Sequence, residues 1–232
     1  MVRLVSAVSE RRLWRVAGGL AIAHVVLLFG SFSVQRVAPL EATQGTVIAD
    51  HVRWSMAKGF SGGYVTCLSM LVFVLAATLL ARLLRADTQV SDWVCSTITA
   101  AAAIYVAVTL GSELANLGAA LYDGHHGASL ETVTAFDHAH WFAVFLASAV
   151  LGLFTLAVAA AVRVSGALPR WVAYTGIVAG AACILAVPGA GSGLVDTATI
   201  LWVLWFVGLA VAALRRPNLA PVPAPAQSRV SV

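Results

Sequence analysis

Charged side chains are scarce in this sequence of 232 residues, because Asp, Glu, Lys and Arg together make up only 10% of it. A soluble domain usually carries about 25% charged residues, which cover its surface in water. Hydrophobic residues make up 60% of the chain, and the mean hydropathy is +0.91. We therefore expect lipid rather than water to surround most side chains. The chain is then an integral membrane protein, and the lipid bilayer is its main partner.

Cysteine is also rare, and a basic surface face is missing. Cys67, Cys95 and Cys183 lie singly within apolar runs, without the spacing of a zinc knuckle, so we expect small buried thiols. The net charge of +4 and the isoelectric point near 9.3 are typical of some nucleic-acid-binding proteins. Here the basic residues stand at the ends of apolar runs rather than on one face, so we expect no nucleic-acid partner.

Six apolar runs are each long enough for a membrane-spanning helix, which needs about 20 residues. None of them alternates apolar and polar residues, which argues against transmembrane strands. The sequence therefore predicts an all-α, polytopic membrane helix bundle with six transmembrane helices within residues 14–216. Their expected ranges are 14–32, 64–84, 93–121, 137–162, 171–187 and 198–214.

The placement of basic residues predicts the orientation of these helices. Cytoplasmic loops of membrane proteins are enriched in Lys and Arg. With the N-terminus inside, eleven arginines lie on the cytoplasmic side, whereas the outer side receives only Arg36, Arg53 and Lys58. We therefore expect both termini in the cytoplasm, and a bacterial inner membrane as the location. Four tryptophans at predicted helix ends are typical of an interfacial aromatic belt: Trp14, Trp93, Trp141 and Trp171.

Three segments outside the predicted spans have a distinct composition. Residues 1–13 form a basic cytoplasmic N-terminus, and residues 217–232 are a Pro- and Ala-rich tail that we expect to be disordered. Residues 41–58 show helical spacing of apolar residues, which predicts an amphipathic helix on the outer surface. Residues 31–33 also fit a signal-peptide cleavage site loosely, so removal of the first helix stays an alternative.

Ionisable side chains within a membrane are costly, which makes each of them a candidate for function. His24 lies near the middle of the first predicted helix, and no second histidine lies at that depth, so we expect no haem and no other cofactor. Glu113 and Asn116 are three residues apart in the third helix and share a face of an α-helix. A carboxyl group within the membrane, such as that of Glu113, needs a hydrogen-bonding or basic partner or must stay protonated. These residues form either a possible intramembrane polar site or a structural contact between helices.

Carboxylates and imidazoles gather in the predicted outer connection between the third and fourth helices. They are Asp123, His125, His126, Asp137, His138 and His140. Such side chains can bind zinc or a similar ion, but their spacing matches no metal motif. Thr134 and Asp137 also fit a capping box at the start of the fourth helix, which explains Asp137 without a metal. We assign no metal site, and a solvated, histidine-rich loop is the alternative.

The connection between the fourth and fifth helices carries the string Ser-Gly-Ala-Leu-Pro-Arg-Trp at residues 165–171, followed by apolar residues and Gly180. This string, the chain length, the long first outer loop and the polar third helix resemble a family of small bacterial multi-pass membrane proteins known as domain of unknown function 4386. The resemblance implies the same six-helix architecture. It implies no activity, and therefore no catalytic residues.

Three functions remain open on these grounds. We expect a structural, accessory or sensory membrane protein without catalysis, whose membrane-protein partners or self-association the sequence leaves open. A small-molecule or proton-coupled transporter would use Glu113, Asn116 and His24. A metal-dependent or redox membrane enzyme would use the outer histidines. A single outward-facing cavity that gathers Glu113, His138 and His140 would favour the second and third alternatives.

Overall fold

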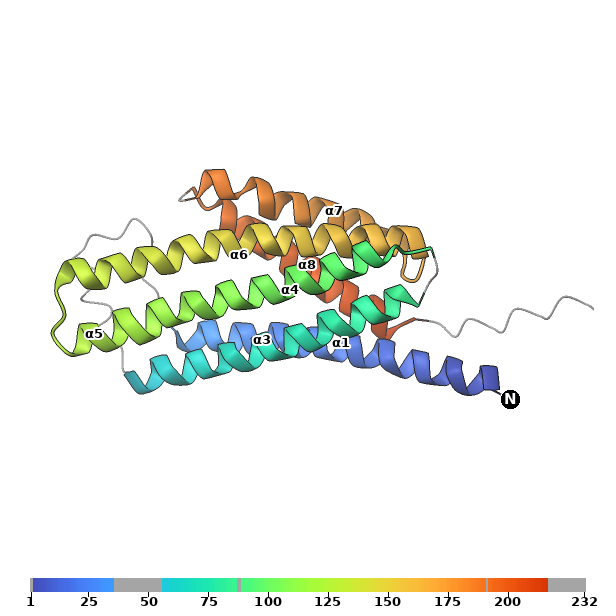
Figure 1. Cartoon of the computed structure of the whole chain (residues 1–232), viewed down its shortest axis with the longest axis horizontal. Helices are drawn as coiled ribbons and strands as arrows, with labels where there is room; N and C mark the ends of the chain where they lie inside the picture. Colours follow the sequence, from blue (N-terminus) through green and yellow to red (C-terminus); the bar gives the residue numbers. More distant parts are fainter. Residues whose placement is uncertain (1, 36–55, 87–88, 191, 217–232) are drawn as a thin grey trace, which may run out of the picture.

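The computed structural model describes residues 2–35, 56–86, 89–190 and 192–216, and within these ranges the chain is helical with no strand. Six long helices lie side by side (Figure 1). They are α1 (Val2–Val34), α3 (Met56–Arg85), α4 (Asp92–Glu113), α6 (Leu130–Ser165), α7 (Arg170–Leu185) and α8 (Leu194–Leu214). The predicted all-α helix bundle is confirmed.

Five of these helices are long and apolar enough to cross a membrane, and α7 is a shorter apolar helix. The 16 residues of α7 span about 24 Å at 1.5 Å per residue. The chain continues through a turn of 3₁₀-helix, η2 (Val187–Gly189), before α8 returns in the opposite direction. The predicted bundle of membrane helices is therefore confirmed, with five helices long enough to cross a membrane and α7 as a shorter apolar sixth helix.

Arginine separates the two ends of the bundle. In the described ranges, every arginine lies in the first half of α1, near the ends of α3 and α6, at the start of α7 or directly after α8, and we call this the arginine-rich end. The opposite, arginine-poor end holds Lys58 within the described residues. At the arginine-rich end, Arg216 pairs with Glu10 at 3.0 Å and lies over the Trp14 ring, which ties the end of α8 to α1.

The six helices form a closed ring around an aromatic core. Each helix packs on the next in the order α1, α3, α4, α6, α7 and α8, and α8 closes the ring against α1. Five rings meet at the centre, and each is nearly or fully buried. They belong to His24, Phe73, Phe154, Trp202 and Phe206.

Glycine allows a tight turn and a close contact between two helices in this bundle. Gly166 ends α6 with a φ of 62°, a left-handed conformation that glycine adopts without strain, and Pro169 precedes the first residue of α7. The connection expected at residues 165–171 is therefore a short turn. Between α6 and α7, a Cβ atom on Gly152 would lie 2.6 Å from the carbonyl oxygen of Gly180, so the two backbones touch there.

Several predicted boundaries are wrong. The helix α6 begins at Leu130 rather than at residue 137, and Ser129 is its N-cap, because its side chain accepts a hydrogen bond from the Thr132 amide. The predicted capping box of Thr134 and Asp137 is thus wrong, since Thr134 lies inside the helix and donates to the Leu130 carbonyl. The third predicted helix changes to a π-helix, η1 (Leu114–Leu121), followed by the short α5 (Tyr122–His125).

Some side-chain predictions also fail. Trp93 and Trp171 are exposed near helix starts, as an aromatic belt requires, whereas Trp14 is buried and Trp141 lies well inside α6. Cys67 is exposed on α3, while the other two cysteines are buried as predicted. Most of the predicted amphipathic segment 41–58, and the tail 217–232, lie outside the described residues.

Candidate functional site

A cavity of about 650 Å³ lies at the arginine-poor end of the bundle. Its position follows from unequal helix lengths, because the 36 residues of α6 span about 54 Å and the 16 residues of α7 only about 24 Å. Figure 1 shows the hairpin of α7 and α8 ending short of α4 and α6 at this end. The start of α8 therefore forms one wall of a space that the longer helices enclose on the other sides.

Five helices line this cavity, namely α1, α3, α4, α6 and α8. The aromatic side chains in the lining are Phe32, Tyr105, Trp141, Phe145 and Trp202. The polar side chains are Gln35, Thr66, Thr109, Ser112, Glu113, His140, Ser148, Asp196 and Thr199. Ligand sites in proteins are typically concave, mostly apolar, and equipped with a few convergent polar groups, and this lining has that composition.

Glu113 is part of a hydrogen-bond network that joins three helices. Its Oε2 atom accepts a hydrogen bond of 3.2 Å from the amide nitrogen of Gln35, the residue that follows α1. The same nitrogen lies 3.2 Å from the Thr66 hydroxyl on α3, which also contacts the hydroxyl of Ser31 at 2.5 Å. Only 9% of Glu113 is exposed, so a buried acid here accepts its hydrogen bond from a neutral donor, the Gln35 amide.

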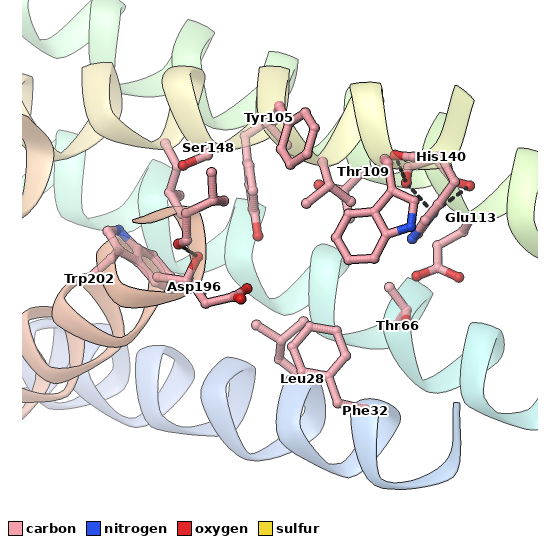
Figure 2. Close-up of a pocket in the computed structure, with 18 of the residues that line it drawn as sticks. Leu28, Phe32, Thr66, Tyr105, Thr109, Glu113, His140, Ser148, Asp196 and Trp202 are labelled. Atoms are coloured by element: carbon pink, nitrogen blue, oxygen red, sulfur yellow. Dashed lines mark hydrogen bonds between the residues drawn. The ribbon is translucent and has the colours of Figure 1, made fainter. Parts of the chain in front are cut away.

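His140 reaches the cavity from α6, next to the end of α4. Its Nδ1 lies 2.6 Å from the Ser112 hydroxyl and 3.2 Å from the Ser112 carbonyl oxygen, which locks α6 against α4. Figure 2 shows His140 and Glu113 close together at one end of the cavity. The fold brings Glu113 and His140 to one cavity because α4 packs against α6.

Asp196 is a cavity residue that sequence reasoning missed. It lies in the first turn of α8, is exposed, and points into the cavity in Figure 2, beside Tyr105 and Leu28. A carboxylate two residues before the expected start of a span, at residue 198, is typical of an ordinary loop residue. Its significance depends on the early start of α8 at Leu194, which the apolar run did not predict.

The aromatic core closes the cavity toward the middle of the bundle. Trp202 forms this floor and stacks on Phe206, with ring centroids 4.8 Å apart. His24 lies behind the floor, edge-on to Trp202, and its Nδ1 is 2.9 Å from the Ser69 hydroxyl. His24 therefore does not line the cavity that contains Glu113. The two residues do not form the shared polar site that a transporter would use.

Asn116 also departs from the predicted arrangement. The α-helix ends at Glu113, and the wider turns of the π-helix rotate the next residues away from its face. Asn116 is fully buried, neither of its amide atoms has a hydrogen-bond partner among the described residues, and it is not among those that line the cavity.

The candidate metal ligands are spread apart. His125, His126 and His138 are exposed, whereas Asp137 and His140 are buried on α6. Within the described part of the chain, no three His, Cys, Asp or Glu side chains lie close enough together to hold a metal ion. Of the three residues proposed to converge on an outward cavity, Glu113 and His140 line it and His138 does not.

Comparison with known proteins adds no relative. No family model, no curated protein sequence and no solved structure matches this chain.

Proposed function

We propose that this multi-pass membrane protein is non-catalytic and binds a small, largely apolar molecule in the cavity at its arginine-poor end. One observation carries the proposal. The cavity volume of about 650 Å³ lies within the 300–1,000 Å³ that is usual for small-molecule sites, and its lining is aromatic with a few convergent polar groups. A sensory or accessory role follows if binding changes the packing of the helices around the cavity.

A cavity-filling substitution tests this proposal. Ala147 is buried on α6 and lines the cavity, so Ala147→Phe places a ring in the ligand's space. Ala103→Phe, on an exposed position of α4 outside the lining, is the matched control. We expect the neutral fluorophore N-phenyl-1-naphthylamine to bind saturably to the wild type and to the control, and at least tenfold more weakly to Ala147→Phe. Equal affinities in all three proteins would reject the site.

The aromatic floor supports a second candidate function, a transporter coupled to protons. A cavity that is accessible at one end and closed by Trp202 at the other resembles one state of an alternating-access cycle. Glu113, a buried acid in the lining, is the residue to carry the proton. In proteoliposomes with a pH gradient, Glu113→Gln is expected to stop uptake of the fluorophore while binding persists. Unchanged uptake in this variant contradicts coupling through Glu113.

We also propose that the arginine-rich end faces the cytoplasm and that the membrane is the bacterial cell membrane. The separation of basic residues between the two ends supports this orientation. The turn at residues 165–171 supports membership in the family known as domain of unknown function 4386, whose members share this plan. Under this orientation, the cavity opens toward the outer side of the membrane.

A further inference from the structure

We propose that the ligand of the cavity is an organic cation, meaning an apolar or aromatic molecule with one permanent positive charge. This inference rests on the proposed binding function and adds the chemical class of the ligand. It depends on three features of the lining, which are its charges, its aromatic rings and the position of its acids.

Among the described residues of the lining, the charged side chains are of one sign. Glu113 and Asp196 are the acids in this set, and it contains no Lys or Arg. The ion pairs among the described residues join Arg85 to Asp92 and Arg216 to Glu10, so neither cavity acid has a basic partner there. Within a largely apolar cavity, a carboxylate attracts a cation more strongly than it does in water. An anionic ligand would meet repulsion from both acids.

The aromatic rings add a second attraction for a cation. Tyr105, Trp141 and Trp202 present rings to the cavity from α4, α6 and α8. A cation within about 6 Å of such a ring centre is attracted to the face of the ring, and Trp is the strongest partner. The same rings pack against an apolar body, so they favour a cation with hydrophobic substituents over a small inorganic ion.

The two acids lie in different parts of the same space. Figure 2 shows Asp196 toward the Trp202 end and Glu113 toward the His140 end. Asp196 is exposed and lies in the first turn of α8. Glu113 is buried and already accepts a hydrogen bond from Gln35. We therefore assign Asp196 as the main partner of the ligand's charge and Glu113 as the second.

Two ions of nearly equal size and opposite charge provide the test. Binding of tetraphenylphosphonium and of tetraphenylborate is measured by equilibrium dialysis with the full chain in an uncharged maltoside detergent. The inference predicts that the wild type binds the cation at least tenfold more tightly than the anion. It also predicts that Asp196→Asn weakens binding of the cation at least tenfold and leaves the anion unaffected or bound more tightly.

Three variants complete the design. Asp196→Glu keeps the charge and is expected to retain the preference for the cation, which separates a charge effect from a folding defect. Glu131→Gln removes an exposed acid outside the lining and is expected to behave like the wild type. Glu113→Gln is expected to weaken cation binding by a smaller factor than Asp196→Asn.

The possible results distinguish this inference from the proposed function. If the wild type binds both ions equally or prefers the anion, and Ala147→Phe weakens both, the cavity binds ligands but the cation inference is wrong. The inference is also overturned if Asp196→Asn and Glu113→Gln both bind the cation like the wild type. If Ala147→Phe weakens the binding of neither ion, the proposed function fails as well.

Discussion

The side-chain amide of Gln35 donates a hydrogen bond of 3.2 Å to Oε2 of Glu113, and this contact joins the end of α1 to the end of α4 across 78 positions of sequence. Thr66 on α3 receives a second hydrogen bond from the same amide nitrogen. One neutral side chain therefore connects three helices beside the cavity.

Loss of the Gln35 amide is expected to destabilise the bundle. Gln35→Met keeps the length of the side chain but removes the donor, which leaves Glu113 without this partner. A hydrogen bond of this kind contributes about 1–2 kcal/mol, so the free energy of unfolding should fall by that amount. Unfolding by sodium dodecyl sulfate in mixed micelles measures the change. Ser33→Ala, which removes an exposed hydroxyl bonded locally to Gly30, is the control, and equal stabilities of the two variants would contradict the network's role.

The backbone contact between α6 and α7 makes a prediction with opposite signs at two glycines. Gly152→Ala places a Cβ 2.6 Å from the Gly180 carbonyl oxygen, so the helices must move apart at an expected cost of about 1–3 kcal/mol. Gly111→Ala in α4 has no atom within 4 Å of the new Cβ, and the better helix propensity of Ala should stabilise it by up to about 1 kcal/mol. Thermal unfolding in detergent measures both changes. A Gly152→Ala protein as stable as the Gly111→Ala protein would show that the helices do not touch there.

The contact of His24 with Ser69 predicts a structural role behind the cavity floor. The Ser69 hydroxyl lies 2.9 Å from Nδ1 of His24 and donates to the His24 carbonyl oxygen at 2.9 Å. Ser69→Ala should lower the free energy of unfolding by about 1 kcal/mol without changing ligand affinity, because neither residue lines the cavity. Stability assays combined with fluorophore titration separate the two effects. A tenfold loss of affinity without loss of stability would instead place His24 in the binding site.

The helices could be predicted from sequence because each apolar run is long enough to span lipid. The arginines lie at the starts of some helices and at the ends of others, and so mark one end of the bundle. The start of α6 could not, because Thr134 and Asp137 imitate a cap while the helix begins seven residues before Asp137. Apolar runs locate the part of a helix that lies in lipid, whereas α6 extends beyond its apolar run.

The cavity could be predicted only in part. Glu113 and His140 stand out in the sequence because ionisable residues near apolar runs are unusual. Their proximity depends on the packing of α4 against α6, and the role of Asp196 depends on the short hairpin of α7 and α8, neither of which a single sequence specifies. The π-helix that separates Asn116 from Glu113 was equally unpredictable, since residues 114–121 have an ordinary apolar composition.

The most direct measurement of the central claim is the accessibility of the cavity from the arginine-poor end. In a background without native cysteines, Thr199→Cys places a thiol in the cavity lining, and Ser165→Cys places one at the arginine-rich end of α6. With a membrane-impermeant maleimide on intact cells, we expect labelling of Thr199→Cys, strong reduction of that labelling by Ala147→Phe, and labelling of Ser165→Cys only after permeabilisation. Labelling of Ser165→Cys but not of Thr199→Cys in intact cells would contradict the account.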